Sequence, residues 1–224
     1  MNQVGFSMGN FKGRLEELSL HADIGYHGHF WRTENDFDNS TNQVRALGYS
    51  PQDDELIQKQ FKQDYSWLCD QPFTLPYYAA GWWFMNNSMV KKLMEENIEA
   101  DFSYSMLRWI SNPYFKTFFK EHQIRFGEPF RLTSNGKSIT CIQTLMGCPN
   151  SPFSEDIIRQ LNTYFDGYQS PMGMLATHDY NLIEGNNLEY NKQMICYLSR
   201  LKNVSLHSAE ELVSQGSKVP LKEI

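Results

Sequence analysis

Short apolar segments alternate with longer amphipathic segments along this chain, and this alternation restricts the folds that it can adopt. Segments with the length and composition of buried strands occur at 22–26, 75–80, 100–105 and 172–177. Helical spacing of apolar residues occurs at 11–20, 50–69, 88–97 and 188–201. Such alternation predicts an α/β protein with a parallel sheet or a barrel. In both architectures ligands bind at the carboxyl ends of the strands.

Local signals predict further elements. The Asn135-Gly136 pair is typical of a two-residue turn and predicts a hairpin between 130–132 and 139–145. Ser208 and Glu211 have the spacing of a capping box, which predicts the start of a last short helix. The remaining expectations are strands at 4–8 and 203–207, a helix at 154–168, a loop at 33–50 and a helix cap at Ser88.

Size and composition predict one globular domain covering residues 1–224. The formal net charge is −6 and no basic block exceeds two residues, which argues against nucleic acid as a partner. No apolar run reaches the length of a membrane-spanning helix, and the first residues lack the pattern of a signal peptide. The four cysteines are widely spaced, as expected for free thiols in a reducing compartment, so we expect a cytoplasmic protein.

Three of the six histidines fall in one segment, residues 21–31. His27 and His29 lie two residues apart after a predicted strand, so both imidazoles would face one side and could bind one metal ion. The alternative is a pair of hydrogen-bonded structural histidines. A catalytic zinc site needs a third protein ligand. Carboxylates that could supply it are Asp23, Glu34, Asp36 and Asp179.

His178 ends another predicted strand and could act as a general acid beside such a metal, with Asp179 orienting its ring. A structural role is again the alternative. We expect structural or solvated positions for the other three histidines, His21, His122 and His207. The chain contains neither a serine nucleophile elbow nor a glycine-rich phosphate loop, which argues against those two classes of enzyme.

Five segments resemble, in the same order, the motifs of the NodB-type polysaccharide deacetylases, the carbohydrate esterase family 4 group. They are 22–29 (ADIGYHGH), 78–83 (YAAGWW), 96–105 (ENIEADFSYS), 175–180 (LATHDY) and 201–212 (LKNVSLHSAEEL). In the family these correspond to the EIG-x-H segment, the RAGGW segment, the GI-x-x-D-x-S strand, the late histidine motif, and the closing strand and helix. The resemblance spans roughly residues 4 to 213.

This resemblance implies a distorted (β/α) barrel that removes acetyl groups from sugars through metal-bound water. It implies Zn²⁺ or another divalent ion, with His27 as a ligand and His29 as a substitute second ligand. It also implies that His178 protonates the leaving group. The partner would be an oligo- or polysaccharide, and the side chains that could line its groove are Trp31, Trp82 and Trp83.

The chain departs from the family at three places. The paired aspartates of the family's first strand have no counterpart before His27. Trp31 occupies the position of the family's second histidine, and the family's orienting arginine aligns with Ala79. Loss of one positioned acid–base group already slows catalysis by about 10²–10⁴-fold. We therefore expect either a barrel that is incomplete at the N-terminus or a member that does not hydrolyse.

Two functions follow from the resemblance. One is a metal-dependent deacetylase that hydrolyses the C–N bond of N-acetyl sugars, impaired by the missing motifs. The other is a non-catalytic carbohydrate-binding protein of the same fold. The residues alone leave a third open, an unrelated metal hydrolase or isomerase on an α/β barrel, in which Asp23 or Glu34 completes the site.

Overall fold

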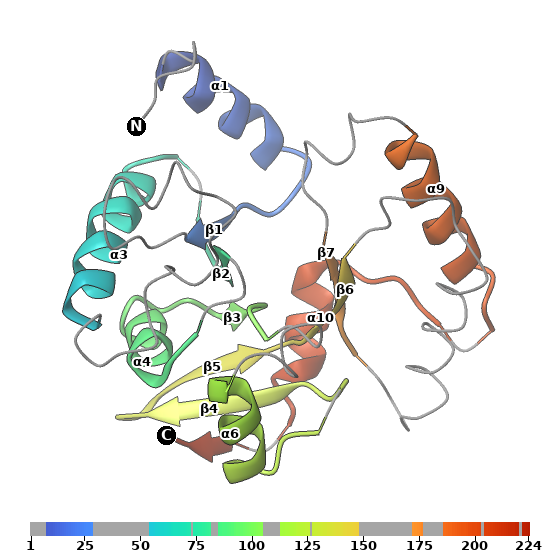
Figure 1. Cartoon of the computed structure of the whole chain (residues 1–224). Helices are drawn as coiled ribbons and strands as arrows, with labels where there is room; N and C mark the ends of the chain where they lie inside the picture. Colours follow the sequence, from blue (N-terminus) through green and yellow to red (C-terminus); the bar gives the residue numbers. More distant parts are fainter. Residues whose placement is uncertain are drawn as a thin grey trace. The chain divides into compact units, whose positions relative to one another are not determined.

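The computed structural model describes residues 8–28, 54–72, 74–81, 85–104, 113–125, 127–147, 172–176, 186–202, 204–219 and 221–224. The helices in these ranges are α1 (Met8–Ser19), α3 (Asp54–Cys69), α4 (Asn87–Glu95), α6 (Pro113–Glu121), α9 (Asn187–Leu198) and α10 (Ala209–Gly216) (Figure 1). The strands are β1 (Gly25–Gly28), β2 (Tyr77–Ala80), β3 (Ala100–Asp101), β4 (Phe130–Ser134), β5 (Lys137–Cys141), β6 (Thr144–Gly147), β7 (Met174–Ala176) and β8 (Leu221–Glu223). The predicted mixed α/β class is confirmed.

The chain forms two compact units. The first comprises residues 1–103, 133–139 and 223–224, and the second comprises 104–132 and 140–222. The strand order in the larger sheet is β1-β2-β3-β5-β4-β8. A second sheet consists of the parallel pair β6 and β7.

Parallel strands in chain order dominate the first unit. Gly25 of β1 pairs with Tyr77 of β2, and Tyr77 pairs with Ala100 of β3, all in parallel register. Helix α3 lies in the connection from β1 to β2, α4 lies in the connection from β2 to β3, and the two helices pack together (Figure 1). Two successive β-α-β units therefore bring the carboxyl ends of three strands to one edge of the sheet.

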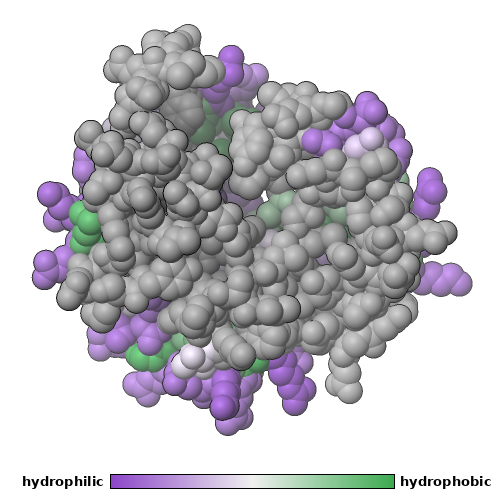
Figure 2. Space-filling model, in the orientation of Figure 1, coloured by the Kyte–Doolittle hydropathy of each residue, from purple (hydrophilic) through white to green (hydrophobic). Residues whose placement is uncertain are grey.

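An aromatic cluster holds α3 against one face of this sheet. The ring of Tyr26 lies 5.4 Å from that of Phe61 in α3 and 5.5 Å from that of Tyr78 in β2, measured between centroids. Tyr26, Tyr78 and Asp101 pair across the three strands and therefore share the face covered by α3. In the view of Figure 2 the coloured part of the surface is mostly hydrophilic, with a few hydrophobic patches.

Helix α4 begins at a different cap from the predicted one. The side chain of Asn86, rather than Ser88, accepts a hydrogen bond from the backbone N–H of Met89. At the other end Asn97 adopts a positive φ of 60°, and Ile98 N–H donates to the carbonyl of Leu93 at 3.0 Å. This is a Schellman ending, in which asparagine replaces the more common glycine.

The predicted hairpin is confirmed and joins β4 to β5. Asn135 and Gly136 both have positive φ, 52° and 76°, as a type I′ turn requires. The strand predicted at 139–145 is interrupted, because β5 ends at Cys141 and β6 starts at Thr144. Between them the buried Gln143 binds backbone groups instead: its amide donates to the carbonyls of Arg125 and Glu128.

The capping box is also confirmed. Glu211 N–H donates to the Ser208 hydroxyl at 3.2 Å, and the Glu211 carboxylate accepts from Ser208 N–H at 2.9 Å. The predicted strand at 203–207 is wrong for its described part, since residues 204–207 form no strand. There the hydroxyl of Ser205 and the ring of His207 bind each other and lead into the cap.

Several boundaries differ from the prediction. β1 starts at Gly25, which pairs with Tyr77 at the start of β2, rather than at residue 22. β3 ends at Asp101, although a strand was predicted to 105. Met8, the end of the strand predicted at 4–8, begins α1. Elements that the sequence patterns did not predict are α6 and β8.

Some predictions lie outside the described residues, namely the loop at 33–50, the helix at 154–168 and residues 4–7. Cys69 and Cys196 are free thiols, whereas Cys148 is outside the described part. No helix within the described ranges has the length and apolar character needed to cross a membrane.

Candidate functional site

The carboxyl edge of β1, β2 and β3 collects residues from three of the resembling segments. His27 comes from β1, the peptide group between Ala79 and Ala80 comes from β2, and Asp101 and Ser103 come from the end of β3. These residues belong to the first unit, and hydrogen bonds link them directly.

His27 lies within β1, one residue before its end, and not after the strand as predicted. Its side chain is exposed and, because neighbouring residues alternate, it projects from the face opposite to Tyr26. Its Nδ1 lies 2.9 Å from the carbonyl oxygen of Ala79. A carbonyl oxygen can only accept, so Nδ1 carries a proton, and whenever the ring is neutral Nε2 is the nitrogen with a lone pair.

Asp101 is fully buried, with an exposed fraction of 0%. Its Oδ1 accepts from the backbone N–H of Ser103 at 2.8 Å and from the Ser103 hydroxyl. Burial raises the pKa of Asp101 to about 7, and the two hydrogen bonds from Ser103 oppose this shift. Its Oδ2 is buried and has no hydrogen-bond partner among the described residues. The carboxyl group therefore changes charge close to neutral pH.

Ser103 explains why β3 is so short. Its backbone N–H donates to Oδ1 of the Asp101 side chain, two residues earlier. Its hydroxyl replaces a ladder acceptor, because Ala80 N–H donates to Ser103 Oγ at 2.8 Å. The preceding ladder bond, from Phe102 N–H to the carbonyl of Tyr78, is intact at 2.8 Å.

A buried phenol lies beside the carboxyl group. Tyr78 has an exposed fraction of 1%, and its hydroxyl has no hydrogen-bond partner in the described part of the chain. Burial, with smaller effects from Tyr26 and Asp101, raises the pKa of Tyr78 well above the usual range. The phenol therefore stays neutral and can only act as a hydrogen-bonding group.

Most of the predicted site residues belong to segments that the structure does not describe. His29, His178, Trp31, Trp82 and Trp83 lie outside the described residues, so the expected meeting of His27 and His178 stays a prediction. Among the proposed third ligands, Asp23 is exposed just before β1, while Glu34, Asp36 and Asp179 are outside the described ranges. Where the structure is described, no three His, Cys, Asp or Glu residues are grouped to hold a metal.

The other histidines agree with the expectation of structural or solvated positions. His21 is exposed, and His207 lies 3.3 Å from Glu211 at the start of α10. The ring of His122 packs on Phe118 at 4.5 Å between centroids. Burial lowers the pKa of His122, Glu121 opposes this shift, and Lys222 adds to it.

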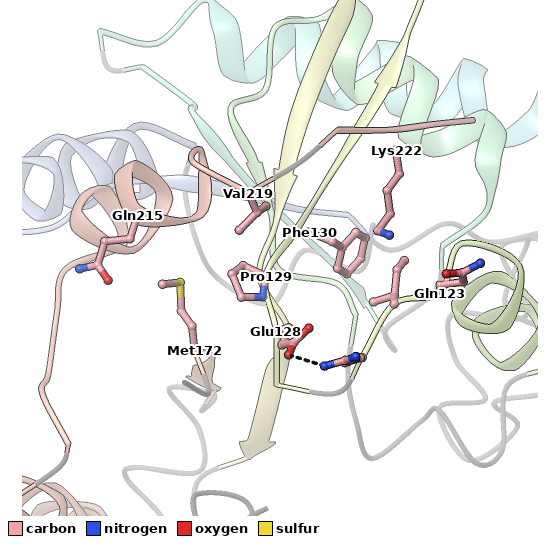
Figure 3. Close-up of a pocket in the computed structure, with 10 residues that line it drawn as sticks. Gln123, Glu128, Pro129, Phe130, Met172, Gln215, Val219 and Lys222 are labelled. Atoms are coloured by element: carbon pink, nitrogen blue, oxygen red, sulfur yellow. Dashed lines mark ion pairs between the residues drawn. The ribbon is translucent and has the colours of Figure 1, made fainter. Parts of the chain in front are cut away.

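A cavity of about 480 Å³ lies within the second unit (Figure 3). Its polar lining consists of Gln123, Arg125, Glu128, Gln215 and Lys222, and its apolar lining includes Pro129, Phe130 and Met172. The guanidinium of Arg125 and the carboxylate of Glu128 form an ion pair at 3.8 Å. The lining therefore combines amide, charged and apolar side chains.

The sequence patterns placed Asp101 in a strand but assigned no role to it or to Ser103. The signal was local, since an Asp followed two residues later by Ser can close a side-chain turn onto its own backbone. The link to His27 had no local signal. Residue 79, which binds the His27 ring, is 52 positions away in the chain.

Comparisons with known proteins do not assign this chain to a family. No protein-family model matches the chain, and no curated protein sequence does either. Among solved structures, the 4-α-glucanotransferase from Thermococcus litoralis matches with a TM-score of 0.48 and 14% identity. The match covers 95% of this chain but 37% of that chain. A score this low does not establish a shared fold, so the match assigns this chain neither a family nor an activity.

Proposed function

We propose that this chain is a polysaccharide deacetylase-like protein, with a distorted (β/α) barrel and an acetylated oligo- or polysaccharide as its substrate. The observations that carry the proposal are the position of His27 and the contact of its Nδ1 with a backbone carbonyl. His27 is exposed at the carboxyl edge of a parallel strand, and its Nδ1–H donates to a backbone carbonyl. Histidines that bind metals usually have such a bond at the other ring nitrogen.

The order of the segments supports the same proposal. Three of the five segments that resemble the family fall on β1, β2 and β3, which are neighbours in the sheet in the same order as in the chain. The helices between them give the β-α-β repeat that a (β/α) barrel needs. His27 projects from the face opposite to the one that α3 covers, and in a barrel that face is the inner one.

A divalent ion fits His27 but does not have a complete ligand set among the described residues. His27 would bind it through Nε2, and the further ligands would come from the predicted His29 and a carboxylate. When bound, such an ion lowers the pKa of water so that it can attack an acetyl carbon at neutral pH. His27 would hold the ion, and His178 would give a proton to the departing nitrogen or oxygen of the sugar, which leaves as an amine or alcohol.

Release of acetate from N-acetylated amino-sugar oligomers tests this proposal. We expect the purified chain to bind about one zinc ion per molecule and to release acetate. His27→Ala should abolish both, because the ring supplies a ligand. His21→Ala is the matched control, since His21 is an exposed histidine six residues earlier and should leave both unchanged. Equal zinc content and equal acetate release in the two variants would refute the proposal.

Carbohydrate binding without hydrolysis is the second candidate, and the cavity in the second unit favours it. A volume of about 480 Å³ is within the range of small-molecule sites, roughly 300–1,000 Å³. Its amide and charged side chains can bind sugar hydroxyls, and Phe130 and Pro129 offer apolar contact.

Calorimetry in the presence of a chelator separates the two functions. Binding of the oligosaccharide that persists without metal and weakens in Gln215→Ala favours the binding protein. A chelator that abolishes both acetate release and binding favours the deacetylase. Gln60→Ala, in α3 of the first unit, is a control for a change of glutamine away from the cavity.

A further inference from the structure

A continuous chain of hydrogen bonds crosses the three parallel strands of the first unit. The Ser103 hydroxyl binds Oδ1 of Asp101. Ala80 N–H donates to the same hydroxyl at 2.8 Å. The carbonyl of Ala79, which belongs to the same peptide group as Ala80 N–H, accepts from His27 Nδ1 at 2.9 Å. One peptide group of β2 thus joins a buried carboxylate in β3 to an exposed imidazole in β1.

The donors in this chain all point the same way. His27 Nδ1–H donates to the peptide carbonyl, the peptide N–H donates to Ser103, and Ser103 O–H donates to the carboxylate. Hydrogen bonds in series polarise one another, and the effect grows in a low-dielectric interior. A negative charge on Asp101 therefore makes the Ser103 oxygen and the Ala79 carbonyl better acceptors.

We propose that Asp101 is a positioning residue for His27, and that it fixes the Nδ1–H tautomer and the ring orientation through Ser103 and the peptide group between Ala79 and Ala80. Asp101 itself lies on the face of the sheet covered by α3, whereas His27 projects from the opposite face. The charge is thereby kept out of the site while its effect is transmitted through the backbone of β2.

The proposal has two consequences, one for the tautomer of the His27 ring and one for metal affinity. The second rests on the proposed function, in which His27 holds a metal ion. A carboxylate that orients a metal-binding histidine is worth about 10–100-fold in metal affinity. Here the carboxylate acts through Ser103 and a peptide group and not by direct contact, so we expect its effect on metal affinity to be near the lower end, about 10-fold. The first consequence, the tautomer of the ring, does not depend on any metal.

Nitrogen NMR of the full chain labelled with ¹⁵N-histidine tests the first consequence. At pH 8 the wild-type His27 ring should show a protonated Nδ1 and an unprotonated Nε2. Asp101→Asn keeps the size of the side chain and an acceptor for Ser103 but removes the charge. Ser103→Ala removes the hydroxyl that links the carboxylate to the peptide. Both should shift the His27 ring toward the Nε2–H tautomer, which a free imidazole prefers in water.

Two further variants distinguish an effect carried by the hydrogen bonds from one caused by disturbed packing around Asp101. Phe102→Leu trims a buried side chain between Asp101 and Ser103 without touching the hydrogen bonds, and should leave the His27 ring shifts unchanged. Ser103→Thr retains the hydroxyl and should restore the wild-type tautomer. In the unaltered chain, a scalar coupling between His27 Nδ1 and the carbonyl carbon of Ala79 provides a measurement that needs no variant to fold.

Zinc competition titrations on the same samples test the second consequence. Asp101→Asn should weaken zinc binding about 10-fold, whereas Phe102→Leu should not. Ring shifts that are identical in wild type, Asp101→Asn and Ser103→Ala, or the absence of the scalar coupling, would overturn the proposal. Ring shifts that change as expected in a wild-type chain without zinc affinity would uphold the role of Asp101 and refute the deacetylase function instead.

Discussion

A buried ionisable group such as Asp101 lowers the stability of the fold whenever it is charged. Its exposed fraction is 0%, and Oδ2 has no hydrogen-bond partner in the described part of the chain. An apolar side chain at this position would avoid that cost. The proposed role of Asp101 in orienting His27 of β1 gives a reason for a carboxylate at this position.

Asp101 makes the free energy of unfolding depend on pH. Its pKa is about 7 in the folded chain, against an ordinary value of 3.8. Between these values the folded state holds a proton that the unfolded state has lost, so stability falls as pH rises, by at most about 1.4 kcal/mol per pH unit. We expect the stability advantage of wild type over Asp101→Asn to shrink between pH 5 and pH 8, as measured by urea denaturation.

Asp70→Asn, a change at an exposed carboxylate in the same unit, corrects for the altered net charge. If Asp101→Asn and Asp70→Asn had the same dependence on pH, Asp101 would not be the titrating group. Above about pH 8 the difference between wild type and Asp101→Asn should be constant, because Asp101 is then ionised in both states.

How far these residues could be predicted depends on the range of their contacts. His27 could be selected because it follows an apolar segment in a glycine-flanked, histidine-rich run. The tautomer of its ring could not be predicted. It depends on the carbonyl of Ala79, which the pairing of β1 with β2 brings next to His27. Asp101 and Ser103 contact each other locally, and this contact was within reach of sequence reasoning.

At the scale of the elements, two glycines have open space around them. We expect the same substitution, glycine to alanine, to lower the free energy of unfolding at one and raise it at the other. An added Cβ would have no heavy atom within 4 Å at either Gly13 or Gly136. Gly136 has φ of 76° in the β4–β5 turn, so Gly136→Ala should destabilise the chain by about 1 kcal/mol. Gly13 lies inside α1, so Gly13→Ala should stabilise by roughly 0.5–1 kcal/mol.

Thermal and urea denaturation of both glycine variants measure these effects. Because sterics are equal at the two sites, only the backbone conformation distinguishes them. A Gly136→Ala variant as stable as wild type would show that the turn does not require a positive φ at that position.

The capping box contributes to the stability of α10. Ser208→Ala removes the acceptor for Glu211 N–H and should lower the free energy of unfolding by about 1 kcal/mol. Ser214→Ala, on the exposed side of the same helix, should change it by no more than a few tenths in the stabilising direction. The difference between these two variants under urea isolates the cap, and equal stabilities would contradict its role.

Elements were predicted well where the signal is local and poorly where it depends on a partner strand. The hairpin turn and the capping box are each specified by a few residues that are close together in the sequence. The strand predicted at 203–207 has suitable residues, but the described residues 204–207 form no strand, and the side chains of Ser205 and His207 bind each other there. The cap of α4 was misplaced because Asn86 and Ser88 are both good caps, and only packing selects between them.

For the molecule as a whole, the alternation of strands and helices was sufficient to predict an α/β fold with parallel strands. Helices α3 and α4 connect β1, β2 and β3 in order, which is the repeat that this alternation indicates. Closure into a barrel requires contacts between residues far apart in sequence, and these leave no periodic signal. The same is true of the expected approach of His178 to His27.

Anomalous diffraction at the zinc edge, from crystals of the full chain grown with zinc, would locate the proposed metal. We expect one strong peak about 2.0–2.1 Å from Nε2 of His27, with the Nδ1 contact to Ala79 preserved and the His178 ring facing the same ion. A peak elsewhere, or crystals in which the rings of His27 and His178 lie on opposite sides of the molecule, would contradict the proposed site.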